Sequence, residues 1–124
     1  MNLIEQAEDF VVKLLKDKLS NSFTYHNCTH TRKMVAAVLT LVDGMNINAD
    51  DKEILLIAAW FHDTGYINGC ANHEDSSSTI ASQFLKEKGK SEEYITKITD
   101  LIKATAKEYV PQTLLEKIIK DADY

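Results

Sequence analysis

Proline and glycine are scarce in this sequence, with one proline and four glycines among 124 residues. Tight turns between strands rely on these two residue types, so their scarcity leaves little room for β-hairpins. No segment shows the alternation of apolar and polar residues that is typical of a half-buried strand. These absences favour an all-α fold.

Cysteine is scarce as well, and the two that occur, Cys28 and Cys70, do not have a metal-binding spacing. No signal peptide is recognisable at the start of the sequence. We therefore expect both cysteines to be reduced thiols, most simply small buried side chains, in a cytoplasmic protein.

Neither a long apolar run nor an excess of basic residues is present. The longest apolar run, from Ile54 to Phe61, is far shorter than the about 20 residues of a membrane-spanning helix. Lys and Arg number 14 against 19 Asp and Glu, which gives a net charge of −5. We expect no membrane partner and no nucleic-acid polymer, because a phosphate backbone is bound by clustered Lys and Arg. An anionic small molecule would need a local cation.

The sequence does have the composition of one globular domain, with 44% hydrophobic and 27% charged residues and no repeat or linker. Apolar residues recur at helical spacing in six segments, which predicts a compact bundle of about six helices formed by residues 1–124. The expected helices are 3–19, about 27–45, a segment capped by Asp50 or Asp51 that ends near Gly65, about 73–88, a segment capped by Ser91, and a segment with Pro111 in its first turn.

The second expected helix carries a histidine on its apolar face. The stripe is formed by Met34, Val38, Leu41 and Met45, with Gly44 near the helix end. Extended backwards, the stripe includes His30, which therefore faces the core. Gly89 stands where a left-handed cap is expected after the fourth helix.

The last expected helix keeps its apolar stripe up to the final residues, without a cap. We therefore expect the protein to continue beyond Tyr124. Asp121 and Asp123 lie to either side of the stripe, so the helical period does not choose between them.

His62 and Asp63 end the longest apolar run, where unpartnered polar groups would cost several kcal/mol. Adjacent helical residues point about 100° apart, yet at a helix end both side chains can reach one point beyond the last turn. The negative pole of the helix dipole favours a cation there. Together with His30 and a late aspartate they form a set of two imidazoles and two carboxylates, which suits Mn, Fe, Co, Ni or Mg as readily as Zn.

Four stretches resemble, in this order and with comparable intervals, the HD superfamily of metal-dependent phosphohydrolases. They are YHNCTH (25–30), HDTGY (62–66), HEDSS (73–77) and IIKDADY (118–124). The resemblance covers about residues 22–124 and implies an all-α bundle that holds a divalent ion. The ligands that it implies are His30, His62, Asp63 and Asp123. One ion is favoured over two, because dinuclear relatives supply further histidines and this chain has four in total.

The resemblance also places His73 and Glu74 near the pocket, where His73 could bind a substrate phosphate or help a second metal and Glu74 could orient the attacking water. The helix dipole alone also favours a glutamate in a first helical turn. Asp63 is our candidate for a double catalytic role, as a ligand and as an acceptor of the proton of the water. His26 lies one helical turn before His30. We expect it to orient His30 or to close the pocket; the alternatives are that it binds the metal together with His30 or that it only caps the helix.

Further residues near these motifs are candidates for phosphate binding or belong to the helix surface. Arg32 and Lys103 are candidates to bind a substrate phosphate, as are Lys33 and Lys107, although cations on helix surfaces are mostly solvated. The serine run 76–78 matches no nucleophile motif and is interpreted as helix surface. No Gly-rich phosphate loop, GxSxG or HExxH motif is present.

The predicted function is a metal-dependent phosphohydrolase that acts on a nucleotide or another small phosphate ester through a metal-activated water. One alternative is a nucleotide-sensing or signalling module with little or no turnover. A third is a helical interaction domain without a site. The sequence leaves the substrate, the native metal and a homo-oligomeric state open.

Overall fold

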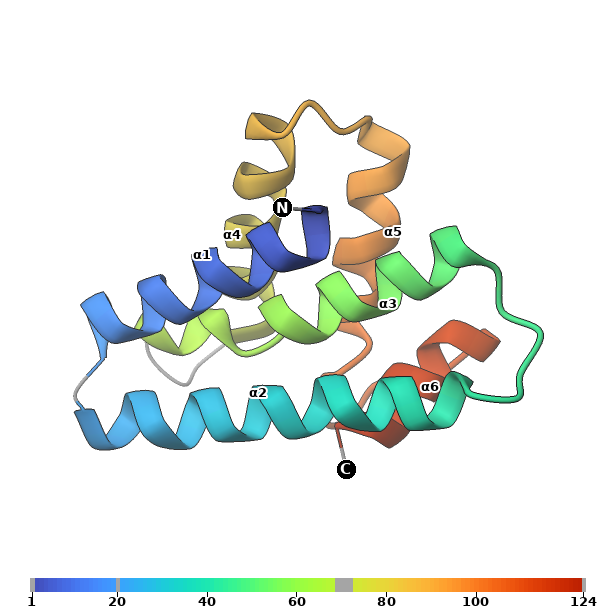
Figure 1. The fold of residues 1–124 in the computed structure, drawn as a ribbon, viewed down its shortest axis with the longest axis horizontal. Coiled ribbons are helices and arrows are strands. Elements are labelled where there is room, and N and C mark those ends of the chain that lie inside the picture. The colour runs from blue at the N-terminus through green and yellow to red at the C-terminus, as the bar shows by residue number, and fades with distance from the viewer. Residues whose placement is uncertain (1, 20, 69–72, 124) are drawn as a thin grey trace.

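The computed structural model describes residues 2–19, 21–68 and 73–123 (Figure 1). Within these ranges the chain forms six α-helices, one short 3-10 helix and no strand. The elements are α1 (Leu3–Lys18), α2 (Asn21–Val42), α3 (Ala49–Phe61), η1 (Thr64–Asn68), α4 (His73–Glu87), α5 (Glu92–Lys103) and α6 (Leu114–Ala122). The predicted all-α fold is confirmed.

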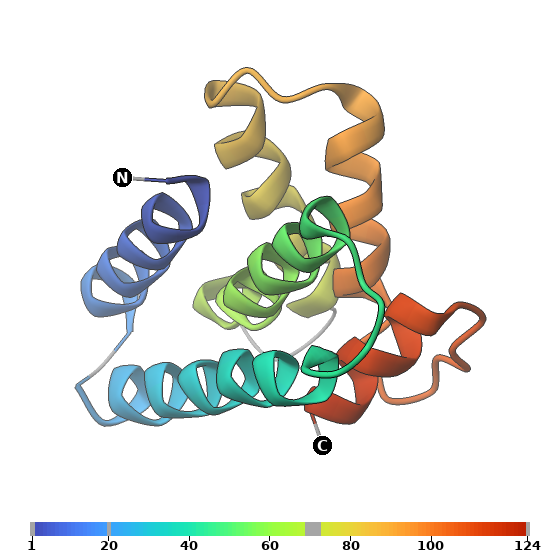
Figure 2. The ribbon, with the colours of Figure 1, turned by 45° about the vertical axis from the view of Figure 1, so that its right-hand side comes forward.

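α3 is the central helix of the bundle. It contacts α1, α2, α4, α5 and α6, and both ribbon views show it in the middle of the others (Figure 1 and Figure 2). Every residue from Ile54 to Phe61 is buried, as expected for a helix that is apolar on all sides. Because buried apolar surface contributes about 25 cal/mol per Å², this run anchors the core.

α2 and α6 pack against each other although they lie far apart in the sequence. In both views the C-terminal end of α6 lies beside α2 (Figure 1 and Figure 2). This packing, together with the position of α3, brings the motifs from the start, middle and end of the chain to one region.

The N-cap of α3 is Asn48, so the prediction of a cap at Asp50 or Asp51 is wrong. The side chain of Asn48 accepts a hydrogen bond from the backbone N–H of Asp51 at 2.8 Å. Asp50 and Asp51 instead lie in the first turn, where the positive end of the helix dipole favours acidic side chains. Asn and Asp cap helices equally well, and here the earlier residue, Asn48, is the cap.

α6 begins at Leu114, so the prediction that Pro111 lies in its first turn is also wrong. The N-cap is Thr113, whose hydroxyl accepts a hydrogen bond from the backbone N–H of Glu116 at 3.1 Å. The Glu116 side chain in turn accepts a hydrogen bond from the backbone N–H of Gln112 at 2.7 Å. These two bonds stabilise a helix start after the proline.

The boundaries of α2 differ from the prediction at both ends. α2 begins at Asn21, earlier than the expected start near residue 27, and it ends at Val42. Gly44 then adopts a left-handed conformation with φ of +82°, which only glycine adopts without strain. Met45 follows this turn and is 42% exposed, so its predicted place on the apolar stripe is wrong.

Several smaller predictions are confirmed. Gly89 has a left-handed φ of +77° after α4, and the side chain of Ser91 caps α5 by accepting a hydrogen bond from the Tyr94 backbone at 3.2 Å. Cys28 is buried, whereas Cys70 lies outside the described residues. In the described part of the chain, no helix combines the length and apolar character needed to cross a bilayer.

Candidate metal centre

His62 follows directly after α3 and has a fully buried side chain. Its Nδ1–H donates a hydrogen bond to the backbone oxygen of Ala59 at 2.7 Å. Because a carbonyl oxygen only accepts, Nδ1 must carry a proton, and in the neutral ring Nε2 is left with a free lone pair. The hydrogen bond to Ala59 therefore leaves Nε2 of the neutral ring available to bind a cation.

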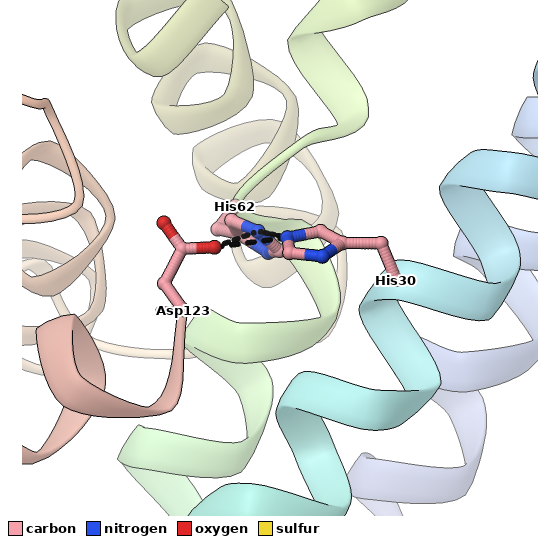
Figure 3. A group of neighbouring side chains, drawn as sticks. All are labelled: His30, His62 and Asp123. Atoms are coloured by element: carbon pink, nitrogen blue, oxygen red, sulfur yellow. Dashed lines mark hydrogen bonds and ion pairs between the residues drawn. The ribbon is translucent and has the colours of Figure 1, made fainter.

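Three side chains from three parts of the chain meet at this nitrogen (Figure 3). The Nε2 atom of His62 lies 3.3 Å from Nε2 of His30 on α2 and 3.1 Å from Oδ1 of Asp123, the C-cap of α6. The His30 nitrogen lies 2.9 Å from the same Asp123 oxygen. The His30 side chain is 43% exposed, so the cluster is open to solvent on the His30 side.

The separations of these donor atoms fit one bound ion. An ion that holds its ligands at about 2.1 Å in octahedral geometry separates adjacent ligand atoms by about 3.0 Å. The three distances between Nε2 of His30, Nε2 of His62 and Oδ1 of Asp123 are 2.9, 3.1 and 3.3 Å. Imidazole nitrogens and a carboxylate oxygen are ligands of divalent transition metals. This group could therefore hold a divalent ion.

Asp63 lies at the edge of the cluster, and its two carboxylate oxygens contact different residues. Its Oδ2 atom lies 3.1 Å from Nε2 of His62 and 3.5 Å from Nε2 of His30. Its Oδ1 atom lies 3.4 Å from Nε2 of His73. The carboxylate of Asp63 thus connects the predicted metal ligands with the predicted catalytic pair on α4.

The two carboxylates beside the His62 ring favour positive charge in the cluster. Burial alone would lower the pKa of His62, but hydrogen bonds to the carboxylates of Asp123 and Asp63 raise this pKa to about 10. Burial opposes the ionisation of Asp123, yet its hydrogen bonds to His30 and His62 hold its pKa well below the ordinary value. A ligating imidazole must be deprotonated, so a divalent cation would take the place of the His62 proton.

A family pattern spans the residues that build this cluster. The family model of the HD domain matches residues 28–124, which is most of the chain. The chain belongs to the HD domain family. This is the superfamily of metal-dependent phosphohydrolases to which the sequence shows a resemblance, and its members bind divalent metals. Comparisons with curated proteins and with solved structures find no significant match.

In this HD domain, His73 and Glu74 form the first turn of α4 beside Asp63. The Nε2 atom of His73 lies 2.5 Å from Oε2 of Glu74. The ring of Tyr66 stacks on the His73 ring, with 4.3 Å between ring centroids and 15° between the planes. The structure therefore places both predicted residues next to the cluster, and it adds Tyr66, to which the sequence analysis gave no role of its own.

Other predicted site residues lie elsewhere. Asp121 is exposed and is not among the three residues that meet at the centre. Arg32 is exposed on α2, and Lys103 lines an open groove between α4 and α5; in the described part of the chain neither makes an ion pair with the cluster. The side chain of His26 lies outside the described residues.

The interpretation of the serine run as helix surface is wrong for two of its members. Ser77 is fully buried and Ser78 is 6% exposed. The signal was available, because Ser77 lies four residues before Ala81 and eight before Leu85, on the backward extension of the apolar stripe of α4. The small polar side chains hid that stripe from a search for large apolar residues.

Proposed function

We propose that this HD domain is a metal-dependent phosphohydrolase that acts on a nucleotide or another small phosphate ester. The observation that carries the proposal is the arrangement of His30, His62 and Asp123, whose donor atoms have the separations expected around one divalent ion. Membership of the HD domain family supports the same chemistry. We propose Asp63 as the fourth protein ligand, on the basis of its contacts with both histidines.

A bound divalent ion would lower the pKa of water and draw negative charge from a phosphoryl oxygen, which together promote hydrolysis of the ester. Asp63 has one carboxylate oxygen toward the centre and the other toward α4, so it can accept a proton at Oδ1. His73 can hold this carboxylate in place, because its Nε2 atom lies 3.4 Å from Oδ1 of Asp63 and 2.5 Å from Oε2 of Glu74, and a proton on that nitrogen can be donated to either carboxylate.

A phosphate ester also fits the charge of this chain. The net charge of −5 repels anions in general, so a phosphate is bound only where a local positive charge offsets it. The cluster favours positive charge at its centre, and it is open on the His30 side. We therefore propose that the phosphate approaches past the His30 ring.

The proposal is tested by metal analysis of the purified protein, followed by titration with Mn²⁺, Co²⁺, Ni²⁺ and Mg²⁺ and by hydrolysis assays on a nucleotide panel and a chromogenic phosphodiester. His62→Ala should lower metal affinity by at least about 100-fold and abolish turnover, because it removes the buried donor atom. Asp121→Asn is the matched control, since Asp121 is exposed on the same helix two residues before Asp123. It should change neither quantity.

Each outcome separates the candidate functions. Equal turnover of the wild type and His62→Ala would contradict the phosphohydrolase. Metal and nucleotide binding without product, with every metal tested, would favour the sensing module. A wild type that takes up no divalent metal would leave the helical interaction domain.

A further inference from the structure

The hydroxyl of Ser77 joins α4 to the turn that follows α3. Ser77 is fully buried in the second turn of α4. Its Oγ–H donates a hydrogen bond to the backbone oxygen of His62 at 2.7 Å, and its Oγ accepts a hydrogen bond from the backbone N–H of Gly65 at 2.8 Å. One side chain thus binds the backbone on both sides of Asp63.

These two backbone groups need a partner from outside their own helix. α3 ends at Phe61, so the carbonyl of His62 and the N–H of Gly65 lie beyond its regular hydrogen bonds. His62 and Gly65 are both buried, and buried backbone groups without a partner are costly. Ser77 supplies the missing donor and the missing acceptor with a single hydroxyl.

The turn also touches the backbone of α4 directly. A Cβ atom built on Gly65 would lie 2.0 Å from the backbone oxygen of His73, 2.8 Å from the backbone nitrogen of Ser77 and 2.8 Å from the Cβ atom of Ser76. Gly65 therefore packs directly against the start of α4. This first turn of α4 contains His73 and Glu74.

Three of the four proposed ligands have side chains positioned by elements other than α4. The His62 ring is oriented by the carbonyl of Ala59 within α3, His30 comes from α2, and Asp123 comes from the end of α6. The position of the His73 ring relative to Asp63 depends instead on how α4 packs against the turn that follows α3. Two contacts fix this packing: the hydrogen bonds of the Ser77 hydroxyl and the close approach of Gly65 to the α4 backbone.

We propose that Ser77 is a positioning residue: its hydroxyl holds the first turn of α4 against the turn after α3 and thereby holds His73 and Glu74 beside Asp63. The catalytic use of that position rests on the proposed phosphohydrolase function. The positioning itself does not, since it concerns contacts within the protein alone.

The test compares Ser77→Ala with Ser78→Ala. The two variants remove the same atom from neighbouring buried positions, but the Ser78 hydroxyl has no hydrogen-bond partner among the described atoms. The reporter is the NMR cross-peak between the ring protons of Tyr66 and His73, whose rings are stacked, in a chain with only four histidines to assign. Co²⁺ absorption titrations report the cluster separately, and hydrolysis assays report turnover.

Ser77→Ala should lose most of the Tyr66–His73 cross-peak and lower turnover about tenfold or more, because small misplacements of catalytic groups are costly. Its Co²⁺ affinity should fall clearly less than its turnover, since the side chains of His30, His62 and Asp123 are positioned without α4 and only Asp63 contacts His73. Ser78→Ala should resemble the wild type in all three measurements. Ser77→Cys restores a weak donor and a weak acceptor, so it should give a cross-peak of intermediate intensity. This variant replaces Ser77→Ala in the test if the alanine variant does not fold.

A full Tyr66–His73 cross-peak in a folded Ser77→Ala, or an equal loss in Ser78→Ala, would overturn the positioning role. A loss of Co²⁺ affinity as large as the loss of turnover would overturn it too, because Ser77 would then act on the whole cluster. A wild type that binds no Co²⁺ would refute the phosphohydrolase, and the cross-peak would still decide the role of Ser77.

Discussion

Gly65 is the residue at which the turn after α3 has no room for a side chain. Its φ is not left-handed, so the backbone conformation alone would accept alanine. The added methyl group of Gly65→Ala, however, would lie 2.0 Å from the backbone oxygen of His73, and a Cβ atom essentially never comes closer than 3.0 Å to a non-bonded heavy atom outside its own residue and chain neighbours. The oxygen belongs to a helix backbone and has no rotamer to change, so α4 and the turn must separate by about 1 Å. Overpacking of this kind costs up to about 3 kcal/mol.

Urea unfolding measures this cost, with Gly89→Ala as the matched control. Gly89 has φ of +77° and no atom within 4 Å of an added Cβ, so its substitution costs only the left-handed strain, about 1 kcal/mol. With an m-value of about 2 kcal/mol per M, Gly65→Ala should lower the urea midpoint by up to about 1.5 M, and Gly89→Ala by about 0.5 M. A Gly65→Ala protein at least as stable as Gly89→Ala would refute the close contact between the turn and α4.

Three further predictions concern pH, a hydrogen bond and a buried hydroxyl. The pKa of His62 is raised from 6.5 to about 10, so the ion pairs of its protonated ring contribute their full stability below pH 6.5 and lose it as the pH rises through 10. The urea midpoint of the metal-free protein should therefore fall between these two pH values. A midpoint that stays constant would contradict the ion pairs. Tyr94→Phe removes the hydrogen bond from the Tyr94 hydroxyl to the partly buried Glu53, which should cost about 1–2 kcal/mol of unfolding free energy; an unchanged urea midpoint would argue against this bond. Ser78→Ala removes a buried hydroxyl without a partner and should leave the thermal midpoint unchanged or raise stability by about 0.5 kcal/mol; a clear loss would reveal a partner for that hydroxyl.

The helices were predictable because each is a repeated local pattern. The apolar run from Ile54 to Phe61 indicates a helix buried on all sides, and α3 is that helix. The ends were harder, because two capping residues of equal quality compete within a few residues, as Asn48 and Asp50 do at the start of α3. The left-handed turn at Gly44 likewise decides that Met45 leaves the stripe.

The buried role of Ser77 shows where residue-type reasoning fails. Serine is small and polar, so a run of serines at a helix start is typical of surface. The need for its hydroxyl arises only because the carbonyl of His62 and the N–H of Gly65 point at α4. That need is a property of two elements in contact, which neither element reveals alone.

By itself the sequence determined the helical fold and the chemistry of the candidate donors, because helical periodicity and side-chain functional groups are local properties. It left Asp121 and Asp123 open by periodicity, and only the resemblance favoured Asp123. The tertiary structure decided which donors meet, placing Oδ1 of Asp123 2.9 Å from His30 and leaving Asp121 exposed. Distances between atoms on α2, α3 and α6 depend on how the helices pack, and packing is decided by the whole core at once.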